Sequence, residues 1–161
     1  MRSKDAIATI VPDREAIRKG ILEFQEAMTR IPGVKLGDCE ECPLTHRFAD
    51  NVYVREIFIP KGTLIVGKIH RHSHPNFLMK GTVSVLTEEG GLQKLTAPLA
   101  MISPAATKRV VYAHEDTVWV TVHVTDKRSL DEIEEEVISK SYAELTAGEA
   151  AEIRGFLEAA K

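Results

Sequence analysis

Three of the chain's 6 histidines stand two residues apart in one short stretch, at His70, His72 and His74. Neutral imidazole is the commonest nitrogen ligand for divalent transition metals in proteins. Alternate side chains of an extended strand point to the same face, so this spacing predicts three rings that lie together. Imidazoles that face the interior without partners are costly to bury, and a metal ion would satisfy them. The alternatives are solvated histidines or histidines that hydrogen-bond within the core.

His123 is the candidate to complete this site. It ends a run in which Trp119, Thr121 and His123 alternate with the valines at positions 118, 120, 122 and 124. If the valines pack beneath the terminal helices, His123 points to the interior, and if they line the interior it points outward. We predict that His70, His72, His74 and His123 hold one divalent transition metal ion, with Fe, Zn, Mn and Ni as the alternatives.

A second group of metal-ligating residue types precedes this stretch. Cys39 and Cys42 form a Cys-x-x-Cys pattern that is followed by His46. In a reducing compartment this spacing suggests metal or redox chemistry before a disulfide. A four-ligand zinc site needs one more ligand, and the acidic neighbours disfavour the thiolate that a redox motif requires. A surface loop with incidental thiols is therefore favoured over a zinc knuckle or a redox site.

The elements that position these residues fall into three zones of a chain that we expect to form a single domain, residues 1–161. Apolar residues at helical spacing (Ile17, Ile21, Phe24, Met28) predict an amphipathic helix over about 13–30. Runs rich in β-branched residues at 53–59, 63–66, 82–86 and 117–124, separated by turns, predict an antiparallel sandwich or barrel over about 50–125. Helical periodicity returns over about 129–160, where Ser129 with Glu132, and Thr146 with Glu149, predict capping boxes.

Composition excludes several classes of function. The 161 residues carry a formal charge of −3 with no polybasic stripe, so a nucleic acid is not an expected partner. The sequence has no long apolar run for a membrane span, and its first residues lack the apolar stretch of a secretion signal. We expect a cytoplasmic protein without membrane contact.

The central region resembles the cupin superfamily, whose members carry two short motifs on a jelly-roll β-barrel. Gly62 or Gly67, then His-Arg-His at residues 70–72, and then Gly81 are similar to the first motif, with His74 where the family has a glutamate. The loop between the His-Arg-His stretch and the position of the family glutamate is shorter than is usual in cupins. The stretches 42–48 and 53–56 are also similar to small cupin-like proteins of uncharacterised function from bacteriophages and prophages. The resemblance implies a mainly β, jelly-roll domain with its helices outside.

The second cupin motif resembles residues 104–109, with Ala106 in place of a glycine and Arg109 in place of the histidine ligand. This resemblance implies that Arg109 enters the mouth of the barrel, where a guanidinium suits a carboxylate or phosphate of a ligand. The alternative is that Arg109 pairs with a surface acid. We predict Arg109 and Tyr112 as ligand-binding residues, with Tyr53 and Glu56 as further acid or base candidates.

Two classes of function remain open at this stage, because one fold hosts many functions. The first is a metal-dependent enzyme that acts on a small, anionic organic molecule. The second is a ligand-binding or interaction module with a structural or vestigial metal, and a phage structural or host-modulating role rests on the family likeness alone. Open sheet edges also predict a homodimer.

Overall fold

The computed structural model describes residues 13–30 and 39–145. The first element is helix α1 (Arg14–Thr29), which begins after Asp13, whose carboxylate accepts a hydrogen bond from the backbone of Ala16 at 3.2 Å. Ile21 and Met28 of α1 are buried against one sheet, as the spacing predicts, whereas Phe24 stays 40% exposed. Neither this helix nor the others described have the length and apolarity to cross a membrane.

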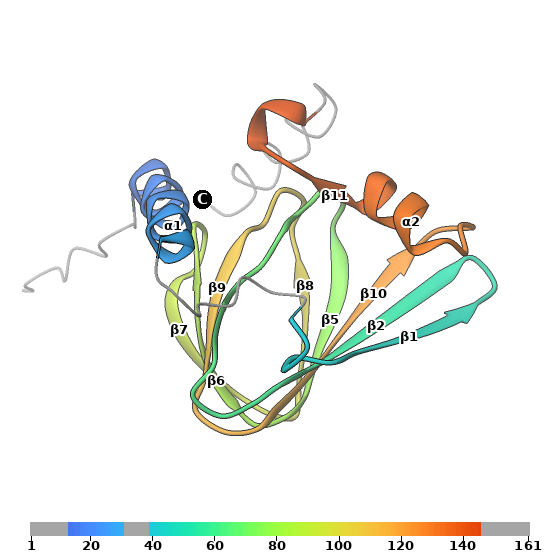
Figure 1. Cartoon of the computed structure of the whole chain (residues 1–161), viewed down its shortest axis with the longest axis horizontal. Coiled ribbons are helices and arrows are strands. Elements are labelled where there is room, and N and C mark those ends of the chain that lie inside the picture. The colour runs from blue at the N-terminus through green and yellow to red at the C-terminus, as the bar shows by residue number, and fades with distance from the viewer. Residues whose placement is uncertain (1–12, 31–38, 146–161) are drawn as a thin grey trace, which may run out of the picture.

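Two antiparallel sheets form the body of the molecule (Figure 1). The five-stranded sheet has the order β1 (Leu44–Ala49), β2 (Val52–Ile59), β10 (Thr117–Val124), β5 (His74–Lys80), β8 (Leu99–Ser103). The four-stranded sheet has the order β3 (Leu64–Val66), β9 (Arg109–Ala113), β6 (Thr82–Thr87), β7 (Gly91–Thr96). A short pair, β4 (Ile69–His70) with β11 (Ile138–Ser139), stands apart from both. The predicted mainly β, antiparallel jelly-roll class is confirmed.

The core lies between the two sheets. Ile57, Leu78 and Trp119 of the five-stranded sheet pack in one cluster with Val83 and Val111 of the other sheet. Strand β10 alternates strictly, with Thr117, Trp119, Thr121 and His123 buried and its four valines half-buried or exposed. The valines therefore line the outer face of the sheet, and His123 points inward.

The C-terminal part of the described chain crosses one end of the sheets (Figure 1). Helix α2 (Leu130–Val137) buries Ile133 and Val137 against Tyr53, as their spacing predicts, and leads into β11 and the short 3-10 helix η1 (Tyr142–Glu144). Ser129 stands at the cap position of α2 but its side chain makes no capping hydrogen bond, so the predicted capping box with Glu132 is wrong. The helix expected from Thr146 lies outside the described residues.

The Cys-x-x-Cys segment is not the surface loop that we expected. Cys42 is only 1% exposed and belongs to the core cluster between the sheets, and Cys39 packs against the same cluster. The two cysteines form no disulfide. His46 lies on β1, where its Nδ1 is 2.8 Å from the hydroxyl of Tyr53. Within the described part of the chain these three residues form no metal-ligating group.

Candidate metal centre

Three histidines from three different strands converge inside the jelly roll. His70 ends β4, His74 begins β5, and His123 lies near the end of β10. Their ring centroids are 4.4 Å apart for His70 and His74, 4.6 Å for His74 and His123, and 5.3 Å for His70 and His123. One ligand nitrogen from each ring lies within 4.8 Å of the other two. The structure thus brings three potential metal ligands together.

A hydrogen bond fixes the orientation of the His74 ring. Its Nδ1 lies 3.0 Å from the backbone carbonyl oxygen of His72, and a carbonyl can only accept, so Nδ1 carries the proton. Nε2 is then the unprotonated nitrogen, and it is buried without a hydrogen-bond partner in the part of the chain that the structure describes. A buried acceptor without a partner is costly, whereas metal-ligating histidines commonly bond a carbonyl through their other nitrogen. The environment of His74 is therefore that of a metal ligand.

Burial keeps all three imidazoles neutral. It lowers the pKa of His70 well below its ordinary value, and His74 and His123 lower it further as like charges. Burial also lowers the pKa of His74 to about 4 and that of His123 to about 3. At neutral pH each ring consequently keeps a lone pair available for a metal ion.

The donor set fits a divalent transition metal. Imidazole nitrogens bind zinc at about 2.0–2.1 Å, so two of them on one ion are at most about 4.2 Å apart. The three nitrogens here lie within 4.8 Å, and small ring rotations bring them into range. Three nitrogen donors without a thiolate suit Zn, Fe, Ni or Cu rather than a hard cation such as Ca²⁺. The residues present thus fit the ion that the sequence predicts.

His72 is not part of the cluster. Its side chain is exposed, because residues 71–73 form a bend between β4 and β5 instead of continuous strand. The expectation that all three clustered histidines point the same way is therefore wrong for His72. This residue contributes its backbone carbonyl, which holds His74, and leaves its own ring in solvent.

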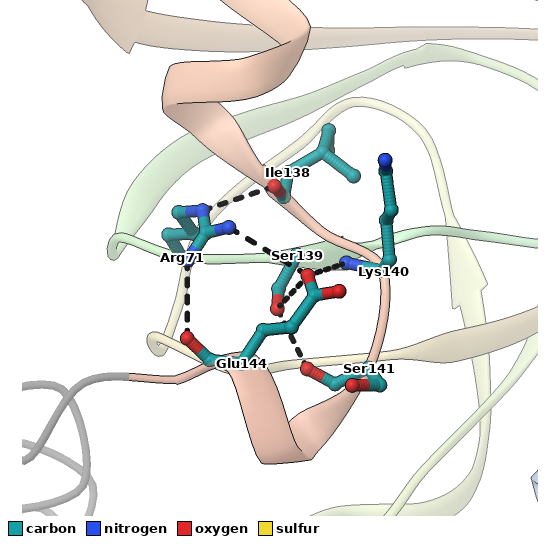
Figure 2. Close-up of polar contacts among 6 residues, drawn as sticks. All are labelled: Arg71, Ile138, Ser139, Lys140, Ser141 and Glu144. Atoms are coloured by element: carbon teal, nitrogen blue, oxygen red, sulfur yellow. Dashed lines mark hydrogen bonds and ion pairs between the residues drawn. The ribbon is translucent and has the colours of Figure 1, made fainter.

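The C-terminal segment holds His70 in place. Strand β11 pairs with β4, with Ile138 opposite His70. Figure 2 shows that Arg71, the residue after His70, contacts Ile138 and Glu144 of this segment. Its backbone nitrogen donates to Val137 at 2.8 Å, its Nε donates to the carbonyl of Ile138 at 3.0 Å, and its Nη2 lies 3.8 Å from a carboxylate oxygen of Glu144. The position of His70 thus depends on contacts with residues far along the chain.

A cavity of about 300 Å³ adjoins the histidine cluster. His70 and His123 line it, and Ile133 and Val137 of α2 close it on one side. Most of the remaining lining is apolar, and the polar exceptions include Thr121, whose hydroxyl is buried and has no hydrogen-bond partner within residues 13–30 and 39–145. The cavity is large enough for a small organic molecule, and its lining also includes the charged residues Arg55, Lys68 and Glu134. The other lining residues of the cavity floor and walls include Leu44, Ile57, Ile59, Ile65, Val111 and Trp119.

Arg109 also lines this cavity. Its guanidinium donates to Asn76 Oδ1 at 3.0 Å and to the hydroxyl of Ser103, and it lies 5.3 Å from the ring centroid of Trp119. Burial lowers the pKa of Arg109 to about 10. Its hydrogen-bond partners are neutral, and no ion pair with an acid is found for it among the described residues. The alternative of a surface pair is therefore wrong, and the charge lies inside the jelly roll.

The backbone conformation before Arg109 agrees with the second cupin motif, the resemblance from which we predicted that Arg109 enters the mouth of the barrel. Ala106 has a φ of 63°, in the left-handed region that favours glycine, and it stands where the cupin motif has a glycine. Its nitrogen donates to the carbonyl of His70 at 2.8 Å. This segment is thereby tied directly to the metal centre.

Tyr112 lies away from the cavity. Residues alternate along β9, so Arg109 and Val111 face the interior while Tyr112 faces the side on which α1 packs. Tyr112 is 40% exposed and meets His114 edge to face, and His114 lies 2.7 Å from the hydroxyl of Ser84. The expectation that Tyr112 binds the same ligand as Arg109 is therefore wrong. Glu56 also faces outward, where it pairs with Arg47 at 3.0 Å.

Two residues near the histidine cluster, Tyr53 and Asn76, make contacts that we did not predict from the sequence. Tyr53 stacks on His123 at 6.1 Å between centroids, and its hydroxyl is engaged by His46. Asn76 is fully buried, and its Oδ1 accepts from both Arg109 and Trp119 Nε1. The signal for both was strand alternation, since Tyr53 opposes His123 in register and Asn76 lies two residues after His74.

No protein-family model and no curated protein matches the sequence. The solved structures that resemble the chain include KdgF from a Halomonas species, with 16% identity, a TM-score of 0.48, and coverage of 60% of this chain and 88% of that one. They also include an RmlC-like cupin with a double-stranded β-helix fold from Methanocaldococcus jannaschii, with 12% identity, a TM-score of 0.45, and coverage of 57% and 87%. A cupin domain from Bordetella pertussis has 20% identity, a TM-score of 0.43, and coverage of 58% and 99%.

Proposed function

We propose that the protein binds one divalent transition metal ion through His70, His74 and His123. The observation that carries this proposal is His74 Nε2, which is unprotonated, buried and without a hydrogen-bond partner among the described residues, on a ring that lies beside two other neutral imidazoles. Three protein ligands leave coordination positions open, which is typical of sites where the metal meets water or a ligand. A metal held there supplies Lewis-acid polarisation or, for iron, redox chemistry.

The ligand that we propose for this site is a small organic anion with an apolar body. Arg109 brings a buried positive charge whose partners in the protein are neutral, and a carboxylate or phosphate of the ligand would compensate that charge. The buried hydroxyl of Thr121 offers a further hydrogen bond. The apolar lining then suits a hydrocarbon portion.

A second candidate is a ligand-binding module that performs no reaction. It is favoured because several acid or base side chains that line the cavity are engaged with other groups of the protein. Glu134 lines the cavity but is paired with Lys68 at 2.7 Å, and the hydroxyl of Tyr53 is engaged by His46. Turnover of a bound ligand by the metal-loaded protein would decide for the enzyme.

The experiment that tests the metal site is a metal analysis of protein purified without chelators and then offered Zn²⁺, Fe²⁺, Mn²⁺ and Ni²⁺ separately. We expect one ion per chain for the wild type with at least one of these metals, and none for the triple variant His70→Ala/His74→Ala/His123→Ala. The matched control is His72→Ala, which removes an exposed imidazole of the same segment and should keep the ion. Wild-type protein that binds none of the four metals stoichiometrically would contradict the proposal.

A further inference from the structure

Cys39 and Cys42 stand outside the histidine cluster, and their backbone already has the shape that a disulfide requires. The backbone nitrogen of Cys42 donates to the carbonyl of Cys39 at 2.9 Å, which closes a tight turn. The first and last residues of such a turn have Cα atoms less than about 7 Å apart. Disulfides usually join residues whose Cα atoms are about 4.4–6.8 Å apart. A bond between the two sulfurs therefore needs little movement of the main chain.

The two side chains lie on the same side of this turn. Cys42 belongs to the core cluster between the sheets, and Cys39 packs against that cluster. Cys42 is 1% exposed, whereas Cys39 is only half-buried. A small reagent can thus reach Cys39 first, with a second thiol beside it. Redox-sensitive cysteines are commonly accessible and placed next to a resolving cysteine in this way.

The surroundings distinguish this pair from a catalyst of disulfide exchange. In such catalysts the thiolate is stabilised at the start of a helix, whereas residues 40–42 form a turn and a bend that lead to β1. Glu40 and Glu41 separate the two cysteines, and negative charge slows a reaction that proceeds through a thiolate. The extent of oxidation at equilibrium depends also on how well the disulfide fits the fold. The pair is therefore suited to slow oxidation and not to rapid turnover.

We propose that Cys39 and Cys42 form a reversible disulfide, with small-molecule disulfides such as oxidised glutathione as the oxidant. Cys39 Sγ attacks one sulfur of the oxidant, which forms a mixed disulfide and releases one thiol. Cys42 Sγ then attacks the Cys39 sulfur, the second thiol leaves, and the bond between the two cysteines remains. Each protein thiol gives its proton to a departing thiolate. The two cysteines together lose two electrons, and the oxidant is reduced to two thiols.

The disulfide would fix the segment from which β1 starts. The carbonyl of Pro43 accepts a hydrogen bond from the backbone of Phe58 at 3.1 Å, which ties this segment to β2. Leu44 and His46 of β1 line the cavity beside the histidine cluster. Oxidation thereby acts on a strand that forms one wall of the cavity. The redox pair involves no metal ligand, so it stands or falls separately from the proposed metal site.

The test equilibrates the full chain with mixtures of oxidised and reduced glutathione. Free thiols are then trapped with N-ethylmaleimide in denaturant and counted by intact mass, which is unambiguous because the chain has only 2 cysteines. We expect two maleimide adducts in excess reduced glutathione, and neither maleimide nor glutathione adducts in excess oxidised glutathione. Dithiothreitol should restore both thiols. Wild-type protein that keeps both thiols, or that stops at a glutathione mixed disulfide, would overturn the proposal.

Single variants test the order of attack. In Cys42→Ala we expect one glutathione to remain on Cys39, because no second thiol displaces it. In Cys39→Ala the remaining thiol is buried and should stay free of glutathione. Circular dichroism shows whether each variant is folded. Should Cys42→Ala fail to fold, peptide mapping of the mixed disulfide that forms transiently in the wild type gives the same information. Glutathione on Cys42 in place of Cys39 would contradict the order.

Glu40→Gln is the matched control, because it keeps both thiols and removes one neighbouring charge. It should reach the same oxidised end state as the wild type, about threefold faster, the effect of one charge about 6 Å away in water. A variant that reaches a different end state would show that Glu40, and not the geometry of the turn, determines whether the disulfide forms.

Discussion

The Nδ1 atom of His74 lies 3.0 Å from the carbonyl oxygen of His72, so the two histidines contribute to the histidine cluster in different ways. His74 presents its ring, whereas His72 presents only its backbone and holds the ring of His74. A residue of any type at position 72 keeps a carbonyl. In the proposed metal site we therefore expect the side chain of His72 to be dispensable and that of His74 to be essential.

We predict that His70→Ala, His74→Ala and His123→Ala each lower metal affinity by at least about tenfold, because even indirect contacts to a metal ligand contribute that much. His72→Ala should leave the affinity unchanged. The measurement is competitive titration against a chromophoric chelator, with circular dichroism to show that the β-rich spectrum is retained. Equal losses for His72→Ala and His74→Ala would refute the assignment.

We predict that metal-free protein loses stability as the pH falls from 6.5 to 5. Burial lowers the pKa of His74 to about 4 and of His123 to about 3, while the unfolded chain takes up protons near 6.5. Below 6.5 the unfolded state thus binds more protons, so the free energy of unfolding falls by up to about 1.4 kcal/mol per pH unit for each such histidine. Urea unfolding with a chelator present measures this slope. His123→Gln should flatten it, and an unchanged slope in that variant would show that His123 does not contribute.

Gly81 and Gly62 allow two turns to be compared that share a positive φ and differ in how closely other atoms surround the glycine. Both have positive φ, at 94° and 82°. A Cβ on Gly81 would lie 2.8 Å from the carbonyl oxygen of Asp116 and 2.6 Å from the hydroxyl of Thr117, whereas a Cβ on Gly62 would meet nothing within 4 Å. Gly62→Ala should cost about 1–2 kcal/mol of unfolding free energy from backbone strain alone. Gly81→Ala should cost more, because the clash is added to the strain, and equal losses in thermal unfolding would contradict this difference.

For the proposed ligand site, we predict that Arg109→Lys weakens the binding of a carboxylate without removing the metal. Lysine keeps the charge but loses the planar fork that is held by Asn76 and Ser103. The probe is benzoate, followed by the visible spectrum of the cobalt(II)-loaded protein. Its dissociation constant should rise by about tenfold, as expected for loss of a bidentate charged contact.

The control for this experiment is Arg47→Lys, which changes an exposed arginine on the outer side of the sheet. It should bind benzoate like the wild type. If Arg109→Lys and wild type bind benzoate equally, the anion does not reach the guanidinium. Metal analysis of each variant separates that result from loss of the ion.

Local patterns account for what the sequence predicts correctly. The run 117–124 alternates between two kinds of side chain, and this alone restricts His123 to one of two faces. Ile133 and Val137 are similarly one helical turn apart, and both are buried. Patterns with a fixed period are visible in the sequence because neighbours along the chain determine them.

Features that depend on distant contacts were not predictable in this way. The bend at residues 71–73 breaks the alternation that would place His72 beside His70, and the pairing of β4 with β11 stabilises the chain there. The inward position of Arg109 followed from a motif resemblance, and the outward position of Tyr112 follows from its offset of three residues on the same strand. An alternating pattern shows which residues share a face of a strand, but packing decides which of the two faces points to the interior.

The pairing of Ile138 with His70 also bears on when the histidine cluster can assemble during synthesis. Residues 70, 74 and 123 leave the ribosome in that order, yet the strand that hydrogen-bonds to His70 follows all of them. Until residues 137–139 have emerged, neither the β4 ladder nor the contacts of Arg71 with Val137 and Ile138 exist. A nascent chain halted before this point would carry all three imidazoles but hold His70 only by its own segment. The proposed metal site is therefore expected to reach its final arrangement only after residues 137–139 have been synthesised.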